Sequence, residues 1–200
     1  EMWPYIAKEI QKTKESLVKV CGIDKHRILL TENVTTGCVL PLWGLPFSSG
    51  DRLLISDCEH PGVVAACKEI AYRKNLVIDI LSVRQLRNGV DGSTNTEKKL
   101  LTLIKQSLKR ETKLVVLSHI LWNTGQVMPI VKLANILSEH TNKPYLLVDA
   151  AQSFGQIPIK EAAQAADIYA FTGHKWACGP EGLGGVTLSE RILSDARPTL

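Results

Sequence analysis

Two charged residues in this sequence follow apolar runs, where a buried charge needs a partner. Lys175 comes shortly after the run "DIYAFT" (167–172), and Asp149 follows four apolar residues at 145–148. An isolated buried charge is costly, so Asp149 requires a cationic or hydrogen-bonding partner. Lys175 could form a plain structural ion pair with Asp149, or both groups could belong to a reactive site.

Residues that could bind an anion occur near these two charges. Thr35, Thr36 and Gly37 open a predicted helix, whose N-terminal amides are suited to phosphate, while Thr172 and His174 add a hydroxyl and an imidazole. An anion cradle, a buried carboxylate and a lysine are the parts that pyridoxal 5'-phosphate (PLP) requires. They bind its phosphate, its pyridine nitrogen and its aldehyde. The sequence therefore favours a PLP site.

Short apolar runs and amphipathic stretches alternate along the chain. Seven runs rich in Val, Ile and Leu predict strands at 27–30, 52–56, 76–83, 113–120, 145–150, 167–172 and 184–188. Amphipathic stretches between them predict helices at 62–75, 95–110 and 129–141. This alternation is typical of a mostly parallel sheet covered on both faces. We therefore predict one domain, a three-layer α/β/α sandwich with a mostly parallel seven-stranded sheet.

Polar segments follow five of the predicted strands. They are "TENVTTG", "DCEHPG", "SHILWNTG", "DAAQS" and "TGHK". Ligands of open α/β sheets bind at the carboxyl ends of the strands, so we expect all five segments at one rim of the sheet. The likeliest exposed loop by composition is 87–95, with its Asn-Gly and Asp-Gly turns.

Composition argues against several other classes of protein. The 200 residues are 44% hydrophobic and 22% charged, as in an ordinary globular domain. The net charge of +4 is spread along the chain without a basic block, so nucleic acid is not a predicted partner. No apolar run reaches roughly 18 residues, and no signal peptide is evident. We expect a soluble, cytoplasmic protein without a membrane partner.

The cysteines and glycines predict neither a metal site nor a nucleotide-binding loop. The odd number of cysteines and the absence of a C-x-x-C pair indicate reduced thiols, which we interpret as small core residues. They are Cys21, Cys38, Cys58, Cys67 and Cys178. The "CEH" segment lacks a second ligand pair at metal-site spacing. "GPEGLGG" matches neither a phosphate-binding loop nor a dinucleotide motif.

Four segments together resemble one enzyme family. "CEHPGVV", "SHILWNTGQVMPI", "VDAAQS" and "YAFTGHKWACGPEGLGG", in this order and spacing, resemble the class V aminotransferase and cysteine desulfurase family of fold-type I PLP enzymes. Within that family, "TENVTTGCVLPLWGL", "DCEHPG" and the Leu-Trp-Asn-Thr-Gly run are most similar to L-cysteine/cystine C–S lyases. The resemblance implies that 1–200 is the large, PLP-binding domain.

The resemblance also implies roles for individual residues. Lys175 resembles the lysine that binds the cofactor aldehyde, and Asp149 the partner of the pyridine nitrogen. Gln152 resembles the donor to the phenolic oxygen, His60 the residue stacked on the ring, and Asn123 a residue near the phenolic oxygen and the substrate. Lys175, His60 and Asp149 would be the catalytic residues.

Four more residues resemble the phosphate-binding residues of the family: Thr35, Thr36, Thr172 and His174. Some candidates have a purely structural alternative. His60 precedes a Pro-Gly helix start and could merely cap that helix. Core packing and pocket lining are both open interpretations for His119, Trp122 and Trp176.

The activity implied by the resemblance is β-elimination of L-cysteine or L-cystine. Its products would be pyruvate, ammonia and sulfide or persulfide, with iron-sulfur clusters as one destination of the sulfur. A homodimer and a sulfur-accepting protein are expected partners. Family members have a smaller carboxyl-terminal domain, which we expect to be absent from this chain together with the substrate-binding arginine and the desulfurase cysteine. Alternatives are a cysteine desulfurase, a selenocysteine lyase, another class V aminotransferase-like enzyme, or a truncated non-catalytic module.

Overall fold

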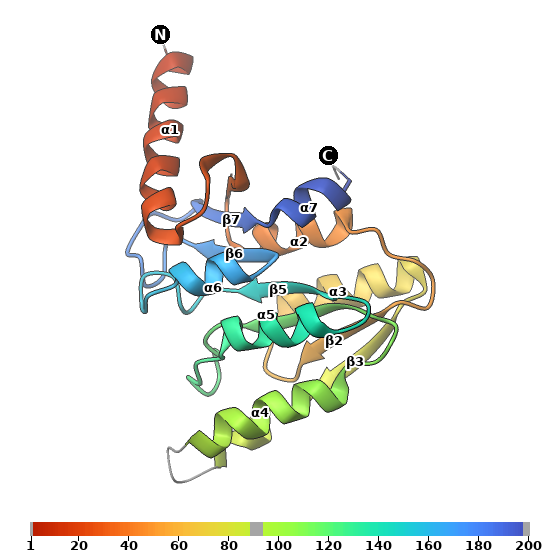
Figure 1. The fold of residues 1–200 in the computed structure, drawn as a ribbon. Coiled ribbons are helices and arrows are strands. Elements are labelled where there is room, and N and C mark those ends of the chain that lie inside the picture. Colours follow the sequence, from red (N-terminus) through yellow and green to blue (C-terminus); the bar gives the residue numbers. More distant parts are fainter. Residues whose placement is uncertain (1, 89–93, 198–200) are drawn as a thin grey trace.

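One sheet of seven strands lies at the centre of the molecule (Figure 1). The computed structural model describes residues 2–88 and 94–197, so most of the predicted 87–95 loop lies outside the described residues. The strand order is β1-β7-β6-β5-β4-β2-β3, and β7 runs antiparallel to both of its neighbours. The strands are β1 (Ile28–Thr31), β2 (Arg52–Ser56), β3 (Val77–Leu81), β4 (Thr112–Ser118), β5 (Tyr145–Asp149), β6 (Ile168–Thr172) and β7 (Gly184–Leu188).

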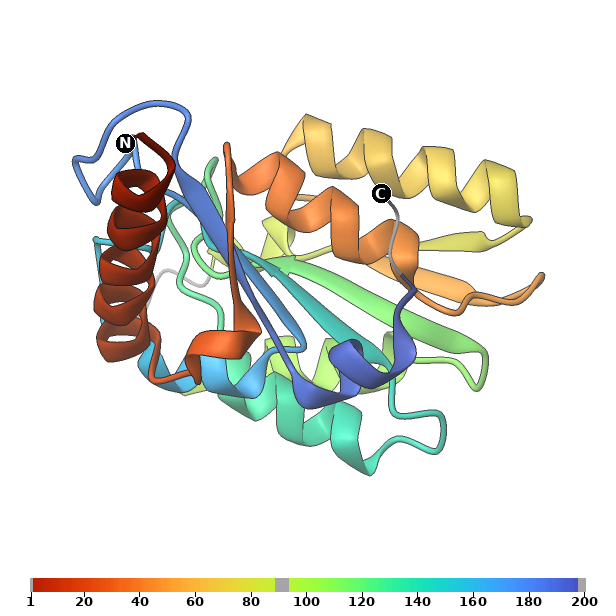
Figure 2. The same ribbon diagram turned by 90° about the horizontal axis from the view of Figure 1, so that it is seen from above.

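Helices cover both faces of this sheet, which confirms the predicted three-layer architecture (Figure 2). On one face lie α2 (Val34–Gly44), α3 (Pro61–Lys74) and α7 (Glu190–Asp195). On the other lie α1 (Met2–Cys21), α4 (Thr94–Ser107), α5 (Ile130–Glu139) and α6 (Lys160–Ala165). Short 3-10 turns occupy Lys25–Arg27 and Arg84–Asn88. Helix α1 projects from the body and buries only Leu17 and Cys21 near its end.

The central strands are apolar on both sides because each face meets a layer of helices. Every residue of β5, β6 and β7 is buried, whereas β3 at the sheet edge is partly exposed. This difference explains why the central strands appear in the sequence as continuous apolar runs. Four of the five cysteines are buried, as predicted. Cys178 is exposed, so its interpretation as a core residue is wrong, because it lies in a surface loop.

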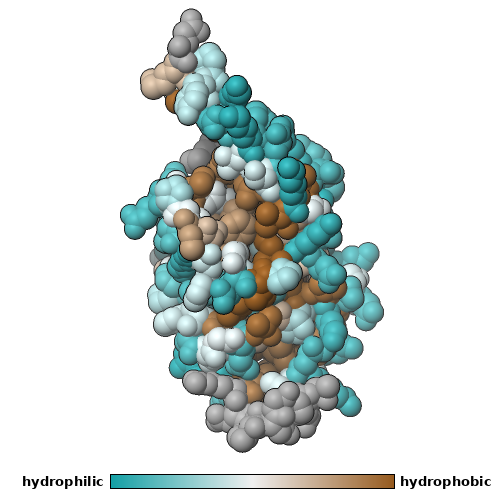
Figure 3. All heavy atoms as spheres, turned by 90° about the vertical axis from the view of Figure 1, so that its left-hand side faces the viewer, coloured by the Kyte–Doolittle hydropathy of each residue, from teal (hydrophilic) through white to brown (hydrophobic). Residues whose placement is uncertain are grey.

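Six of the seven strands run in the same direction, so their carboxyl ends meet at one rim of the sheet. This rim lies on the left in Figure 1 and carries the five polar segments predicted to meet there. Seen from that side, hydrophobic side chains gather in a patch below α1 (Figure 3). Trp122, Val127 and Trp176, all on loops that leave this rim, are more than half exposed.

Candidate active site

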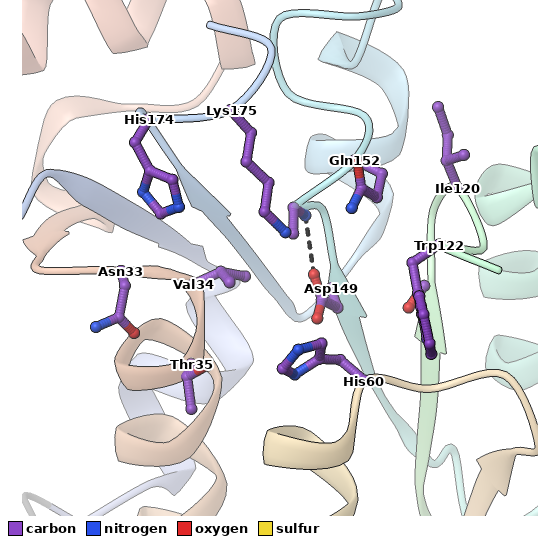
Figure 4. A pocket seen from close by; sticks show the side chains of 12 residues that line it. Asn33, Val34, Thr35, His60, Ile120, Trp122, Asp149, Gln152, His174 and Lys175 are labelled. Atoms are coloured by element: carbon purple, nitrogen blue, oxygen red, sulfur yellow. Dashed lines mark hydrogen bonds between the residues drawn. The ribbon is translucent and has the colours of Figure 1, made fainter. Parts of the chain in front are cut away.

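A cavity of about 220 Å³ opens at the carboxyl rim (Figure 4). Six of the nine predicted site residues line it: Thr35, His60, Asp149, Gln152, His174 and Lys175. They come from α2, the start of α3, and the loops after β5 and β6. Segments distant in the sequence therefore converge on one cavity, as the strand directions require.

Asp149 ends β5 at the floor of this cavity and is 4% exposed. Its Oδ1 accepts a hydrogen bond of 2.8 Å from the backbone N–H of Ala151. Burial raises the pKa of Asp149 above its ordinary value, while the Ala151 N–H and the nearby charges of Lys175 and His60 oppose that rise. Asp149 is therefore a buried carboxyl group with room for one more cationic partner.

Lys175 lies in the loop after β6 and extends toward Asp149 (Figure 4). Within the described residues the two side chains form no direct ion pair, although the lysine charge lowers the pKa of Asp149. The loop is held by a 3.0 Å hydrogen bond from the Cys178 N–H to the Lys175 carbonyl and by a 2.8 Å bond from Gly179 to Gly173. The purely structural ion pair that the sequence left open is thus not formed.

His60 both caps a helix and lines the cavity. Its Nδ1 accepts a 3.2 Å hydrogen bond from the Gly62 N–H at the start of α3, so the capping interpretation is confirmed. The same ring meets the Trp122 ring edge-on, with centroids 6.5 Å apart. Because capping uses one ring nitrogen, it orients the imidazole that lines the cavity.

The predicted phosphate-binding residues divide into two groups. Thr35 and His174 line the cavity, whereas Thr36 and Thr172 do not. The Thr36 N–H donates to Oδ1 of Asn33, the N-cap of α2, at 2.9 Å. Thr172 is fully buried, and its Oγ1 lies 2.8 Å from Nδ1 of His174, which it orients. Thr172 therefore supports the lining residue His174, whereas Thr36 belongs to the capped first turn of α2 and lines a separate cavity.

Asn123 does not line the cavity, and its buried side-chain amide lies beside the Cys58 thiol without a nitrogen or oxygen partner among the described residues. Such a group is costly unless it meets a ligand or water. Gln152 lies in the cavity, and its Oε1 accepts a 2.8 Å hydrogen bond from Nε1 of Trp176. Trp122 also lines the cavity, whereas His119 is buried and bonds the hydroxyl of Tyr169.

Sequence reasoning missed five lining residues: Asn33, Val34, Ser118, Ile120 and Ala151. It also missed Glu59, the middle residue of "CEH", which is 6% exposed and hydrogen-bonds Ser118. The signal in the sequence was weaker than at Asp149, because Glu59 is three residues beyond the end of the apolar strand and Asp57 is the carboxylate that directly follows it.

The residues that line the cavity fit PLP. The Asp149 carboxyl lines it with one hydrogen bond and a raised pKa, and Lys175 lines it beside Asp149. A ring nitrogen that carries a proton beside Asp149 would supply the missing cation. Within residues 2–88 and 94–197, no three His, Cys, Asp or Glu side chains group as metal ligands. No helix in that part of the chain is long and apolar enough to cross a membrane.

Comparison with known proteins identifies the family. The chain is 30% identical over 179 residues to a cysteine desulfurase of Haloferax volcanii, a match covering 88% of this chain and 39% of that protein. It is 32% identical over 177 residues to a probable cysteine desulfurase of Haemophilus influenzae, covering 88% and 38%. The chain therefore spans less than half the length of these relatives.

Two solved structures share the fold across most of the chain. The complex between the cystine C–S lyase C-DES and its reaction product cysteine persulfide is 37% identical, with a TM-score of 0.85, covering 96% of this chain and 50% of that one. A C-DES mutant with glycine covalently linked to its PLP cofactor is 36% identical, with a TM-score of 0.86 and the same coverage. The model of the family described as Aminotransferase class-V matches residues 2–200, and this chain belongs to that family.

Proposed function

We propose that this chain carries the cofactor site of a PLP-dependent carbon-sulfur lyase that acts on L-cysteine or L-cystine by β-elimination. The main observation that supports this proposal is that Lys175, Asp149 and His60 line one cavity at the carboxyl rim of the sheet. The similarity to the cystine C–S lyase C-DES supports this choice of reaction. Because the chain spans only half of that neighbour, the activity proposed is that of the whole protein.

Each lining residue has a task that its chemistry suits. PLP, when bound, supplies an aldehyde that condenses with amines and a ring that accepts electrons. Lys175 would bind the aldehyde carbon, and Asp149 would hold the proton of the ring nitrogen. The His60 ring would lie against the cofactor ring, and Thr35 and His174 would bind the phosphate.

Lys175 would also move the proton at the substrate Cα. With the substrate amine at the aldehyde, the Lys175 Nζ would be a free base that extends toward Asp149 and could accept this proton. Ionised Asp149 would hold a proton on the ring nitrogen, and that positive charge would favour loss of the Cα proton. Gln152 and Asn123 would contact the phenolic oxygen, and the thiolate at Cβ would then leave as sulfide or persulfide.

The first experiment is a titration of the purified chain with PLP followed by borohydride reduction. We expect an absorption band near the visible edge that borohydride removes, and a peptide map with the reduced cofactor on Lys175. A label on another lysine would contradict the assignment. The second experiment measures pyruvate and sulfide from cystine and from cysteine with the full gene product.

A cysteine desulfurase is the second candidate, because curated relatives carry that name. It would transfer the sulfur to a cysteine and leave alanine instead of pyruvate. Of the five cysteines here only Cys178 is exposed, and none matches the desulfurase nucleophile, which the resemblance places outside these 200 residues, so the reaction products decide between the two candidates. Pyruvate as the main product supports the lyase, and alanine supports the desulfurase. Homodimerisation and a separate sulfur acceptor belong to the same proposal.

A further inference from the structure

Glu59 is a second buried carboxyl group, set behind the wall of the site cavity. It lies in the loop between β2 and α3, directly before His60. On one side it lines a separate cavity of about 240 Å³ together with Ser56 and Lys68. On the other side it binds Ser118, which lines the site cavity. Glu59 therefore separates the two cavities.

Both oxygens of Glu59 are engaged by neighbouring strands. Its Oε1 accepts hydrogen bonds from the Ser118 N–H at 2.9 Å and from the Ser56 hydroxyl. Its Oε2 accepts a 2.7 Å bond from the Ser118 hydroxyl. Ser118 pairs in register with Asp149 of β5. One side chain thus ties the ends of β2 and β4 together and anchors the loop that carries His60.

The charges around Glu59 disfavour its ionised form. No cation contacts it among the described residues, and the charge of Asp149 repels a second negative charge. Burial and that repulsion raise the pKa of Glu59 to about 7, against the lowering effect of its hydrogen bonds. Its chain neighbours Asp57, Cys58 and His60 are titratable, and so are the groups that share its surroundings on other elements: Cys38 of α2, Cys67 and Lys68 of α3, and Asp149 of β5.

We propose that Glu59 is a positioning residue of the cofactor site, which holds Ser118 and the His60 loop beside Asp149 as a neutral carboxylic acid. This inference rests on the proposed PLP site. A cationic ring nitrogen beside Asp149 keeps Asp149 ionised, and the charge of Asp149 already contributes to the raised pKa of Glu59, so Glu59 is the carboxyl of the pair that carries a proton. A ligand that binds this neutral form more tightly than the ionised form is bound together with up to one proton from solvent.

The neutral form also changes what Ser118 offers the cavity. A proton on Oε2 turns that oxygen into a donor to the Ser118 hydroxyl oxygen, while Oε1 keeps both of its donors. The Ser118 O–H is then free to rotate and donate into the cavity. The same hydrogen-bonded frame therefore survives protonation, and one hydroxyl becomes available to a ligand.

The test compares the pH dependence of PLP binding in the wild type and in Glu59→Gln. Glutamine reproduces the shape and hydrogen bonding of the neutral acid but takes up no proton. Above about pH 7 we expect the wild-type Kd to rise with pH more steeply than the variant's, by up to about tenfold per pH unit. The matched control is Glu69→Gln, the same change at an exposed residue of α3, which should follow the wild type.

A second measurement needs no variant. Infrared difference spectra of wild-type protein labelled with ¹³C-glutamate should show the carbonyl stretch of a buried carboxylic acid at neutral pH, stronger after PLP binding. PLP binding with no such band, or with identical pH profiles for wild type and Glu59→Gln, would overturn the role of Glu59 alone. Failure of the wild type to bind PLP would overturn the proposed function and this role together.

Discussion

Replacing Glu59 with glutamine should remove a pH-dependent loss of folding stability from the cofactor-free protein. The pKa of this carboxyl rises from its ordinary 4.5 to about 7, chiefly through burial. Because the folded-state pKa lies above the unfolded-state value, the stability linked to Glu59 is complete below about pH 4.5. It is lost as the pH rises through about 7.

The size of the effect follows from the shift. A rise from 4.5 to about 7 corresponds to about 3 kcal/mol in the free energy of unfolding. Glutamine can keep the bonds to Ser56 and Ser118 and cannot ionise. The stability of the wild type relative to Glu59→Gln should therefore fall by about 3 kcal/mol over this pH window and stay constant above it.

Urea unfolding at closely spaced pH values measures this difference, provided that the two proteins have equal m values. Glu69→Gln, whose carboxylate is exposed and bonds Arg73, should stay parallel to the wild type at every pH. Parallel curves for Glu59→Gln and the wild type would refute the reasoning, because they would mean that Glu59 ionises in the fold as readily as in the unfolded chain.

Three further predictions concern the cofactor site. Lys175→Ala should keep the far-ultraviolet circular dichroism of the wild type but lose all borohydride-fixed PLP. Asp149→Asn should keep the fold and slow deuterium exchange at the substrate Cα about a hundredfold, and near-normal exchange would contradict its role. Gly155→Ala should weaken PLP binding more than tenfold, since its Cβ would lie 2.5 Å from the backbone nitrogen of Ala177 in the Lys175 loop. Gly50→Ala, with a similar positive φ and nothing within 4 Å, should cost only about 1 kcal/mol of stability and leave binding unchanged.

The sheet was predictable because its strands are buried on both faces. Runs such as 145–148 are continuous and apolar. All seven predicted strands occur within one residue of their expected bounds, except that β3 and β4 end two residues earlier. Helices α6 and α7 were not predicted, because six residues are too few to display a helical period. Only the start of helix α2 was predicted from the sequence, because the helix is apolar nearly all round and contains Pro41.

The residues that would react with the cofactor were predictable from the sequence. The residues that only hold the lining side chains in place were harder to predict. Lys175 and Asp149 can be recognised in the sequence because they are charged residues beside apolar runs. Thr172 could not be separated from the lining residues, because only the structure shows that it lies behind His174. Ser118 has no local signal at all, since its significance comes from Glu59, which is 59 residues away in the sequence.

Asp149 and Glu59 show how surroundings assign different tasks to similar groups. Both carboxyls are buried and hydrogen-bonded, but only Asp149 has the charges of Lys175 and His60 nearby. Two adjacent negative charges in a buried region repel each other strongly, so the carboxyl with cationic neighbours is the one that ionises. The carboxyl that faces only hydroxyls and an amide keeps its proton more readily. The charge of the site is thereby concentrated at Asp149, where a cationic ligand can meet it.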